Sequence, residues 1–429
     1  MLKIYILSLG CAKNRVDSEC LAGVLRRAGH LIVSEAEEAE AVIVNTCGFI
    51  QPAVEENISV ILDLEEMKSQ GKLQKIGVVG CLFNRYGVEL AKGFDTVDFW
   101  AESEAWDKVL EALGSKTSRG RVRANLPDSP FFTRYLKISE GCDNRCTYCA
   151  IPSIRGSLCS LSVKTVVSEA LHLVEEGAKE LCVVGQDLTA YGMDFAGKSQ
   201  LTQLLDALEN ELPEGVKLRL LYLHPDRVTS QLLERIVSGS KILNYLDIPI
   251  QHADEGILAA MNRGISKERL IDIFRCARSL DADFALRTTC MVGFPGETRR
   301  AFGRLLDFLE KVQFDRVGAF TYFAEEGTQA AAMPKQVRKS TKESRLAELM
   351  ELQEQISFER QQRFEGKMLR VLVEKTDTDY AEGRSYREAP EVDGVIEIIN
   401  ARGTLRVGDV INVKIKEALP HDLTGEEVR

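Results

Sequence analysis

The chain has 429 residues, of which 45% are hydrophobic and 28% charged, a balance typical of a folded globular protein and not of a disordered or fibrous one. At about 150 residues per domain, this length predicts about three domains. Fifty-five Lys and Arg against 65 Asp and Glu give a net charge of -10, which argues against broad attraction to nucleic acid and favours a basic partner.

The N-terminus carries no signal-peptide cleavage pattern, and no apolar run is long enough to cross a membrane, so we expect a cytoplasmic protein. In a reducing compartment, the eleven cysteines are metal ligands, reactive thiols or buried apolar residues and not disulfides. Five of them lie in apolar or helical patterns, and we predict that they are buried in the core: Cys20, Cys159, Cys182, Cys276 and Cys290.

The first part of the chain, residues 1–120, alternates short strands with helices. The strand candidates lie at 3–10, 39–48 and 75–82, and the helix candidates at 17–29 and 54–71. This pattern predicts a small parallel-sheet α/β domain. The stretch 115–130 is basic at first, then contains Pro, and has no clear period, so it is predicted to be a linker.

The alternation becomes more regular in the second predicted domain, residues 130–335. The strand candidates are 134–140, 180–185, 217–224, 244–250, 283–293 and 315–323, and helical stretches between them include 163–177, 232–239 and 301–312. Six β/α units imply a parallel sheet that is either doubly wound or curled into a partial barrel. In both architectures, the chemistry lies at the carboxyl ends of the strands.

A charged helical segment follows and is predicted to connect two domains over residues 336–365. After Gly366 the hydrophobic period changes to two, and glycines at turn positions separate the strand candidates. Residues 366–429 are therefore predicted to form a compact all-β domain, a small barrel.

Three cysteines, Cys142, Cys146 and Cys149, follow the first strand of the second domain with the spacing C-x3-C-x2-C. A structural zinc site needs four ligands, and a plain ferredoxin cluster needs four cysteines. A [4Fe-4S] cluster held by three thiolates instead leaves one iron free to bind a substrate or cofactor. Zinc binding or coincidence is the alternative.

This motif, on the first strand-to-helix loop of a β/α barrel and with Tyr148 between its last two cysteines, resembles the radical S-adenosylmethionine superfamily. The resemblance implies that the open iron chelates S-adenosylmethionine. An electron from the cluster then cleaves an S-C bond of this cofactor and produces a 5'-deoxyadenosyl radical, so a low-potential electron donor is also implied.

A second set of cysteines, Cys11, Cys47 and Cys81, lies in the first domain, and each closes a predicted strand beside a glycine. In a parallel sheet, strand ends meet at one edge, so the three thiols can converge despite their separation along the chain. We infer a second three-thiolate cluster with one open iron. The alternative is three unrelated small residues in turns.

Two such clusters resemble the methylthiotransferase family, and the similarity runs over nearly the whole chain. It is carried by "SLGCAKNRVDSE", "VNTCGFIQPA", "VVGCLFNRY", "SEGCDNRCTYCAIPSIRG", "VVGQDLTAYG", "LDIPIQHA", "VGFPGET" and a C-terminal β domain of the TRAM type. The resemblance implies two [4Fe-4S] clusters and S-adenosylmethionine as both methyl donor and radical source. In that family, the auxiliary cluster carries a sulfur that is methylated and then installed as CH3S on an unactivated carbon, and the resemblance implies the same here.

Two branches of the family differ in substrate: adenosine of tRNA next to the anticodon, or the β-carbon of an aspartate in small-subunit ribosomal protein twelve. The segments "GRSYREAPEVDGVIEI", "NTCGFIQPAVEENI" and "CAIPSIRG" resemble the ribosomal-protein branch. Residues 368–429 hold nine Lys and Arg and thirteen Asp and Glu, a net charge of 9 - 13 = -4. An acidic domain suits a basic protein better than tRNA, although a solvated acidic face is the plain alternative.

Other site candidates follow from the resemblance. Gln186 and Asp187 follow the second strand of the barrel, where the superfamily binds the amino group of S-adenosylmethionine. Arg287 is a candidate for its carboxylate, or it pairs within the barrel. The backbone N-H groups of "GFPGET", residues 293–298, could face the cofactor.

The sequence departs from the family at Cys159 and Leu161, where relatives commonly carry arginines on either side of a serine. We predict that Cys159 is not a ligand, because a cluster with four thiolates could not bind the cofactor. A function of another class, an iron-sulfur electron carrier or scaffold without transferase activity, also agrees with the cysteine pattern.

Overall fold

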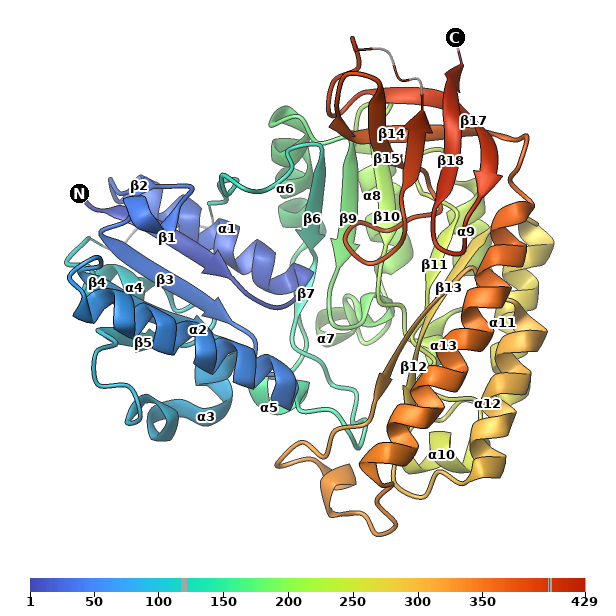
Figure 1. Cartoon of the computed structure of the whole chain (residues 1–429), viewed down its shortest axis with the longest axis horizontal. Helices are drawn as coiled ribbons and strands as arrows, with labels where there is room; N and C mark the ends of the chain where they lie inside the picture. Colours follow the sequence, from blue (N-terminus) through green and yellow to red (C-terminus); the bar gives the residue numbers. More distant parts are fainter. Residues whose placement is uncertain (117–121, 400, 402, 429) are drawn as a thin grey trace.

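The structure is a computed structural model that describes residues 1–116, 122–399, 401 and 403–428. The predicted linker at 115–130 lies partly outside the described residues. Figure 1 shows an N-terminal α/β part, a central α/β part and a C-terminal β part along the chain. Among the described helices, none combines the length and the apolar character that a membrane crossing requires.

The N-terminal part is a five-stranded parallel sheet in the order β2-β1-β3-β4-β5 with helices around it. Its strands are β1 (Lys3–Ser8), β2 (Leu31–Ile32), β3 (Ala41–Thr46), β4 (Lys75–Gly80) and β5 (Phe99–Ala101). Its helices are α1 (Ala12–Arg27), α2 (Gln51–Ser69), α3 (Cys81–Ala91) and α4 (Trp106–Ala112), with a 3-10 turn η1 (Ala36–Glu38). The predicted strands are the three central ones, β1, β3 and β4, whose carboxyl ends therefore lie side by side.

The central part contains six parallel strands in two three-stranded sheets, β10-β9-β6 and β11-β12-β13. A bridge between Leu218 and Ile242 links the two sheets, so the six strands form the predicted partial barrel. The strands are β6 (Thr133–Lys137), β9 (Glu180–Val184), β10 (Lys217–Leu220), β11 (Tyr245–Asp247), β12 (Ala285–Val292) and β13 (Arg316–Thr321). A two-stranded hairpin, β7 (Ser139–Glu140) with β8 (Cys159–Ser160), frames the loop after β6.

Helices cover the barrel with apolar faces that share one core with the strands. They are α6 (Val163–Glu175), α8 (Leu201–Glu211), α9 (Ser230–Ser238), α10 (Glu255–Ala260), α11 (Lys267–Leu280) and α12 (Arg299–Val312). Short elements are α5 (Ile151–Arg155), α7 (Met193–Ala196), η2 (Leu188–Ala190), η3 (Pro225–Arg227) and η4 (Gln329–Ala332). Five helices begin at a side chain that accepts a backbone N-H bond, as N-caps do: Ser162, Thr229, Asp254, Ser266 and Thr298.

A long helix, α13 (Lys339–Gln362), lies along the barrel on the side of β13 and α12. Leu349 and Ile356 of this helix are buried in the barrel core. The helix therefore covers the open edge that six strands leave, in addition to connecting two parts of the chain.

The C-terminal part is a closed five-stranded barrel, β14-β15-β16-β18-β17, which confirms the predicted small β barrel. Its strands are β14 (Met368–Thr376), β15 (Tyr380–Arg384), β16 (Ile396–Ile399), β17 (Val410–Ala418) and β18 (Leu423–Val428). Alternate residues of β14, Leu369, Val371 and Val373, fill its core, as the period of two predicts.

The loop between β15 and β16 packs on the amino-terminal end of the central barrel, seen at the top of Figure 1. Arg219 of β10 donates to the carbonyl oxygens of Ser385 (3.0 Å) and Tyr386 (2.8 Å). Tyr245 of β11 donates its hydroxyl to Asp393 at 2.6 Å. These contacts leave the carboxyl end of the barrel free for a functional site.

The five cysteines predicted to be buried differ in their exposure to solvent. Cys20, Cys182 and Cys290 are buried, and Cys276 is half-buried. The prediction is wrong for Cys159, which is exposed, because it lies on the two-residue strand β8 at the edge of a small hairpin and not in the core.

A buried group of charges joins α11, β13, α13 and the C-terminal loop. Asp315 accepts from Arg278 at 2.8 Å, from Arg360 at 3.2 Å and from Arg387 at 3.4 Å. Burial alone would raise the pKa of Asp315, but the three guanidinium groups hold it below its usual value.

Replacing this carboxylate, in Asp315→Asn, should lower the free energy of unfolding by about 3–5 kcal/mol, because buried guanidinium groups lose their counter-charge. The folded pKa is below the usual 3.8, so this contribution is complete at neutral pH and is lost only as the pH falls through the folded pKa. Urea unfolding at pH 7 checks it. Asp272→Asn, at an exposed pair with Arg275, is the control and should leave the midpoint unchanged; equal midpoints for the two variants would contradict the prediction.

Candidate functional site

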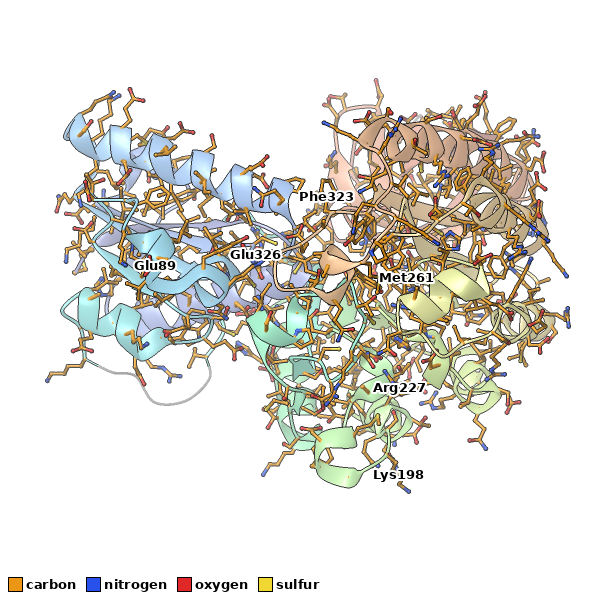
Figure 2. The ribbon with its side chains drawn as sticks, turned by 90° about the horizontal axis from the view of Figure 1, so that it is seen from below. Glu89, Lys198, Arg227, Met261, Phe323 and Glu326 are labelled. Carbon is orange, nitrogen blue, oxygen red and sulfur yellow. The ribbon has the colours of Figure 1, made fainter. Side chains whose placement is uncertain are left out.

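The loop after β6 and β7 carries Cys142, Cys146 and Cys149 at the carboxyl end of the central barrel. Backbone bonds hold it in place: Cys142 N-H donates to the carbonyl of Gly156 and Thr147 N-H to the carbonyl of Met261, both at 3.1 Å. Figure 2 looks at this end of the molecule, with Met261 at the end of α10 and Arg227 in η3.

A cavity of about 220 Å³ opens beside this loop and is lined by all three of these cysteines. Tyr148 and Gln186 line it from the barrel, whereas Lys13 and Phe49 reach it from the N-terminal part. The cavity therefore lies where two parts of the chain meet.

The other three cysteines follow the adjacent strands β1, β3 and β4, and the structure brings them together. The side-chain oxygen of Asn14 lies 4.0 Å from the sulfur of Cys11 and 3.8 Å from that of Cys81. Gly10, at a φ of +95°, approaches Cys47 so closely that an added Cβ would lie 2.8 Å from the Cβ of this cysteine. Only glycine allows this approach of the first loop to the second.

Two of these thiols lie at the N-termini of helices. Cys11 is the N-cap of α1, and Cys81 is the first residue of α3. A helix N-terminus favours negative charge, and thus a thiolate. The pKa of Cys11 is lowered, because Lys13 and the backbone N-H of Asn14 outweigh desolvation.

Burial has the opposite effect at other positions of the two sets, and it also outweighs the helix N-terminus at Cys81, whose pKa is raised. It raises the pKa of Cys47 to about 11 and that of Cys149 to about 12. Metal binding to such thiols must displace their protons, so cluster loading is coupled to proton release.

The spacing of the sulfurs distinguishes a single ion from a cluster. Within the described part of the chain, only Asp17, Glu104 and Glu140 bring three possible ligand atoms within 4.8 Å of one another. A single zinc ion with Zn-S bonds of about 2.3 Å would need sulfurs about 3.8 Å apart. Neither cysteine set brings all three of its sulfurs within 4.8 Å of one another, which argues against a single zinc ion at either set.

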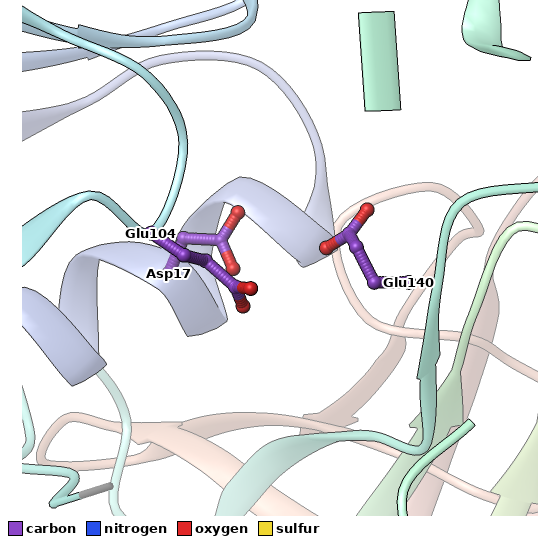
Figure 3. Close-up of side chains that lie close together, drawn as sticks. All are labelled: Asp17, Glu104 and Glu140. Carbon is purple, nitrogen blue, oxygen red and sulfur yellow. The ribbon is translucent and has the colours of Figure 1, made fainter. Parts of the chain in front are cut away.

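The carboxylates of Asp17, Glu104 and Glu140, shown in Figure 3, already have a cation. Lys137 donates to Asp17, and to Glu104 and Glu140 at 2.8 Å each. The group is an ion-pair cluster around the buried Lys137, between the N-terminal and central parts, and needs no metal ion.

Arg155, the last residue of α5, connects the two cysteine sets. Its Nε lies 3.0 Å from the sulfur of Cys81, and its other nitrogens donate to Asp17 at 2.7 Å and to Asn14 at 2.5 Å. Since α5 begins two residues after Cys149, one short segment links the first cysteine set to the second.

A second polar contact joins the same two parts of the chain. Arg85 of α3 pairs with Glu325 at 2.8 Å and donates to the carbonyl of Glu326 at 3.3 Å. Figure 2 shows Glu326 on the segment of the central part that lies against the N-terminal part. The orientation of the N-terminal part is thus set by contacts on two sides.

The remaining predicted site residues have different surroundings. Gln186 and Tyr148 line the cavity, and the Tyr148 hydroxyl accepts from Arg263 at 3.2 Å. Asp187 is buried in an ion pair with Arg227 and accepts from Asn144 at 2.8 Å, so its charge is already compensated.

Arg287 does not line the cavity. It pairs with Asp247 at 2.9 Å and with Asp393 of the C-terminal loop at 3.3 Å, which favours the pairing alternative. The first amide of "GFPGET", at Gly293, donates to Glu297 at 2.8 Å and is therefore occupied within the segment.

Sequence reasoning did not single out several cavity residues, among them Lys13, Tyr222, His224 and Gln251. Tyr222 and Gln251 have positive φ angles of 66° and 67°, a strain that clusters at functional sites and has no sequence signal in a non-glycine residue. Burial beside Arg263 lowers the pKa of His224 to about 3, so this imidazole is neutral at physiological pH. Lys13 and Gln251 lie within motifs that were noticed, "LGCAKN" and "LDIPIQHA".

Three family models match the chain: Uncharacterized protein family UPF0004 over residues 3–102, Radical SAM superfamily over residues 136–309, and TRAM domain over residues 366–428. The fold resembles that of TsrM from Kitasatospora setae, a radical S-adenosylmethionine methyltransferase, with a TM-score of 0.54 and 14% identity over 75% of each chain. The cobalamin-dependent S-adenosylmethionine radical enzyme OxsB matches with a TM-score of 0.53 and 12% identity over 77% of this chain and 54% of its own.

Together, the barrel and its cysteine loop define a radical S-adenosylmethionine enzyme. Relatives named ribosomal protein uS12 methylthiotransferase RimO match nearly the whole chain. That of Desulforamulus reducens is 41% identical and that of Carboxydothermus hydrogenoformans 42% identical, each over 99% of both chains. The chain belongs to this methylthiotransferase family, whose members use [4Fe-4S] clusters and S-adenosylmethionine.

The two cysteine sets predict the iron content. Anaerobically reconstituted protein should hold about eight irons per chain, and Cys146→Ala and Cys47→Ala should each hold about four. Iron and sulfide quantification checks this. Cys159→Ala is the matched control and should keep about eight; a loss of iron in this variant would show that the exposed cysteine is a ligand after all.

Arg155 predicts an effect on the reduction potential of the auxiliary cluster. A charged hydrogen bond to a ligand sulfur stabilises the reduced state by about 1.5 kcal/mol, or roughly 60 mV for a one-electron couple. Arg155→Met in the Cys146→Ala background, where only the auxiliary cluster remains, should shift the potential negatively by this amount. Redox titration followed by electron paramagnetic resonance checks it, with the exposed Arg300→Met as control; equal potentials in the two variants would refute the effect.

Proposed function

We propose that this chain is a methylthiotransferase that inserts CH3S at the β-carbon of an aspartate in the small-subunit ribosomal protein uS12. The observation that carries the proposal is a pair of three-cysteine sets that Arg155 links, in a chain that matches uS12 methylthiotransferases over nearly its whole length. One set would hold the radical cluster and the other the auxiliary cluster.

Within this proposal, Cys142, Cys146 and Cys149 hold one cluster, and Cys11, Cys47 and Cys81 hold the other. When bound, the clusters and S-adenosylmethionine supply the hydrogen abstraction, the sulfur and the methyl group. Gln186 and Tyr148 line the cavity beside the first set and are proposed to contact S-adenosylmethionine. Asp187 and Arg287 are assigned a less direct part, because both are engaged in ion pairs.

The remaining side chains of the cavity keep its walls in place. Arg263 donates to the Tyr148 hydroxyl and, at 2.7 Å, to the carbonyl of Pro249, so it ties the cysteine loop to the segment after β11. Phe49 and Tyr222 present aromatic rings to the cavity, and rings of this kind limit the access of water to a reacting radical.

The charge of the C-terminal barrel supports a basic protein as substrate. Two of its arginines, Arg384 and Arg387, are buried in ion pairs. The turn between β14 and β15 exposes Asp377 and Asp379. We propose that this acidic surface contacts uS12, since complementary charges steer association.

The proposal also includes a low-potential electron donor, because the radical cluster must be reduced before each cleavage. A ribosomal protein as substrate would place the reaction in the cytoplasm. Lys13, two residues after Cys11, lines the cavity of the first cysteine set, and the proposal has a single bound substrate meet both sites.

Mass spectrometry of a strain that lacks the protein tests the substrate. We expect uS12 to lose the mass of CH3S in place of H and tRNA to be unchanged. Loss of the modification from tRNA instead of uS12 would contradict the proposed substrate. Purified protein with dithionite and S-adenosylmethionine should also form 5'-deoxyadenosine; none forming with intact clusters would favour an electron carrier or scaffold.

A further inference from the structure

Lys13 is a cation that the N-terminal part contributes to the cavity. It is the second residue of α1 and lies two positions after Cys11. Its side chain lines the cavity together with Cys142, Cys146 and Cys149. Lys13 therefore stands between the two cysteine sets.

Unlike its neighbours, Lys13 has no carboxylate partner. Its residue is only 9% exposed, and among the described residues no carboxylate oxygen lies within 4.0 Å of its ammonium group. The nearby cations Lys137 and Arg155 each bind both Asp17 and Glu140. A buried ammonium group is costly unless it is paired. The Cys11 thiolate is the nearest negative group that the chain supplies, and with no carboxylate bound to it the ammonium group is available to an anion in the cavity.

The Lys13 ammonium group is held over an aromatic ring. Its Nζ lies 4.1 Å from the centroid of the Tyr222 ring, which offers a partial cation-π interaction. Tyr222 itself is fixed in its strained backbone conformation, since its N-H donates to Asp247 at 3.0 Å and its carbonyl accepts from Leu188 at 3.1 Å. The cation is thus preorganised and faces the cavity.

A carboxylate is the ligand group that fits this arrangement, and two sources could bring one to the cavity: the substrate aspartate and S-adenosylmethionine. The substrate is favoured by position. The β-carbon must reach both the radical site and the sulfur site, and the side-chain carboxylate is bonded directly to that carbon. A cation between the two cysteine sets would meet it there.

Resting on the proposed function, we propose that Lys13 binds the side-chain carboxylate of the substrate aspartate above the Tyr222 ring and so positions the β-carbon between the two clusters. Lys13 is then a specificity-determining residue. The adenine base carries no carboxylate next to its reacting carbon, so in this proposal the contact that positions the reacting carbon is specific to an aspartate substrate.

The test compares binding of purified uS12 with binding of its Asp→Asn variant, made at the position where mass spectrometry locates the wild-type modification. Fluorescence anisotropy on reconstituted enzyme should show about tenfold tighter binding of the aspartate form, the size of one charged hydrogen bond. Lys13→Met should lose this preference. The control Lys339→Met, at an exposed residue of α13, should keep it.

Two further measurements separate the possible sources of the carboxylate. The dissociation constant of S-adenosylmethionine should be unchanged in Lys13→Met, and iron content is measured for each variant so that only cluster-loaded protein is compared. Weaker binding of S-adenosylmethionine with an intact aspartate preference would assign Lys13 to the cofactor and overturn the proposal. If methionine disturbs cluster loading, Lys13→Gln supplies a second neutral variant for the same comparison.

The outcomes also separate this inference from the function on which it rests. Wild-type enzyme that leaves uS12 unmodified would overturn the proposed function. Wild-type enzyme that modifies uS12, with an unchanged aspartate preference in both Lys13 variants, would overturn only the role of Lys13.

Discussion

The buried guanidinium group of Arg155 is the contact on which the arrangement of the site depends. A desolvated cation must be paired and fully hydrogen-bonded to be tolerated, and Arg155 finds its partners on both sides of a boundary: Asp17 and Asn14 in the N-terminal part and Glu140 in the central part. Its remaining nitrogen contacts the sulfur of Cys81. Separation of the two parts would leave these charges unpaired, so the network holds the cysteine sets at one distance.

The opposite end of the central barrel is closed by a different part of the chain. The C-terminal loop meets the amino-terminal strand ends through Arg219, Tyr245 and Arg384, and α13 covers the edge that a six-stranded barrel leaves open. These two covers bury the barrel core without using its carboxyl end. The N-terminal part meets that end and completes the cavity, which explains why the site includes residues from two of the three parts.

This geometry determines which part of the chain supplies which residues to the cavity. The central barrel supplies the first cysteine set and the strained residues Tyr222 and Gln251, whereas the N-terminal part supplies Lys13 and Phe49 and carries the second cysteine set next to Lys13. In the proposed reaction, the N-terminal part thus both presents the sulfur and selects the substrate. The C-terminal barrel packs on the opposite end of the central barrel, and its acidic surface is the part that we propose to contact the substrate protein.

The amino-acid sequence by itself determined the order of the elements, the three-part architecture and the convergence of Cys11, Cys47 and Cys81. The spacing of hydrophobic residues along the chain predicts strands and helices, and the carboxyl ends of neighbouring parallel strands lie at the same edge of a sheet. Only the tertiary structure decided that Cys159 is exposed, that Arg287 is paired, and that Arg155 contacts Cys81 from 74 positions away. The position of Lys13 over Tyr222 also depends on the tertiary structure. Contacts between two parts of the chain depend on how those parts dock, and the hydrophobic periodicity within each part does not predict the docking.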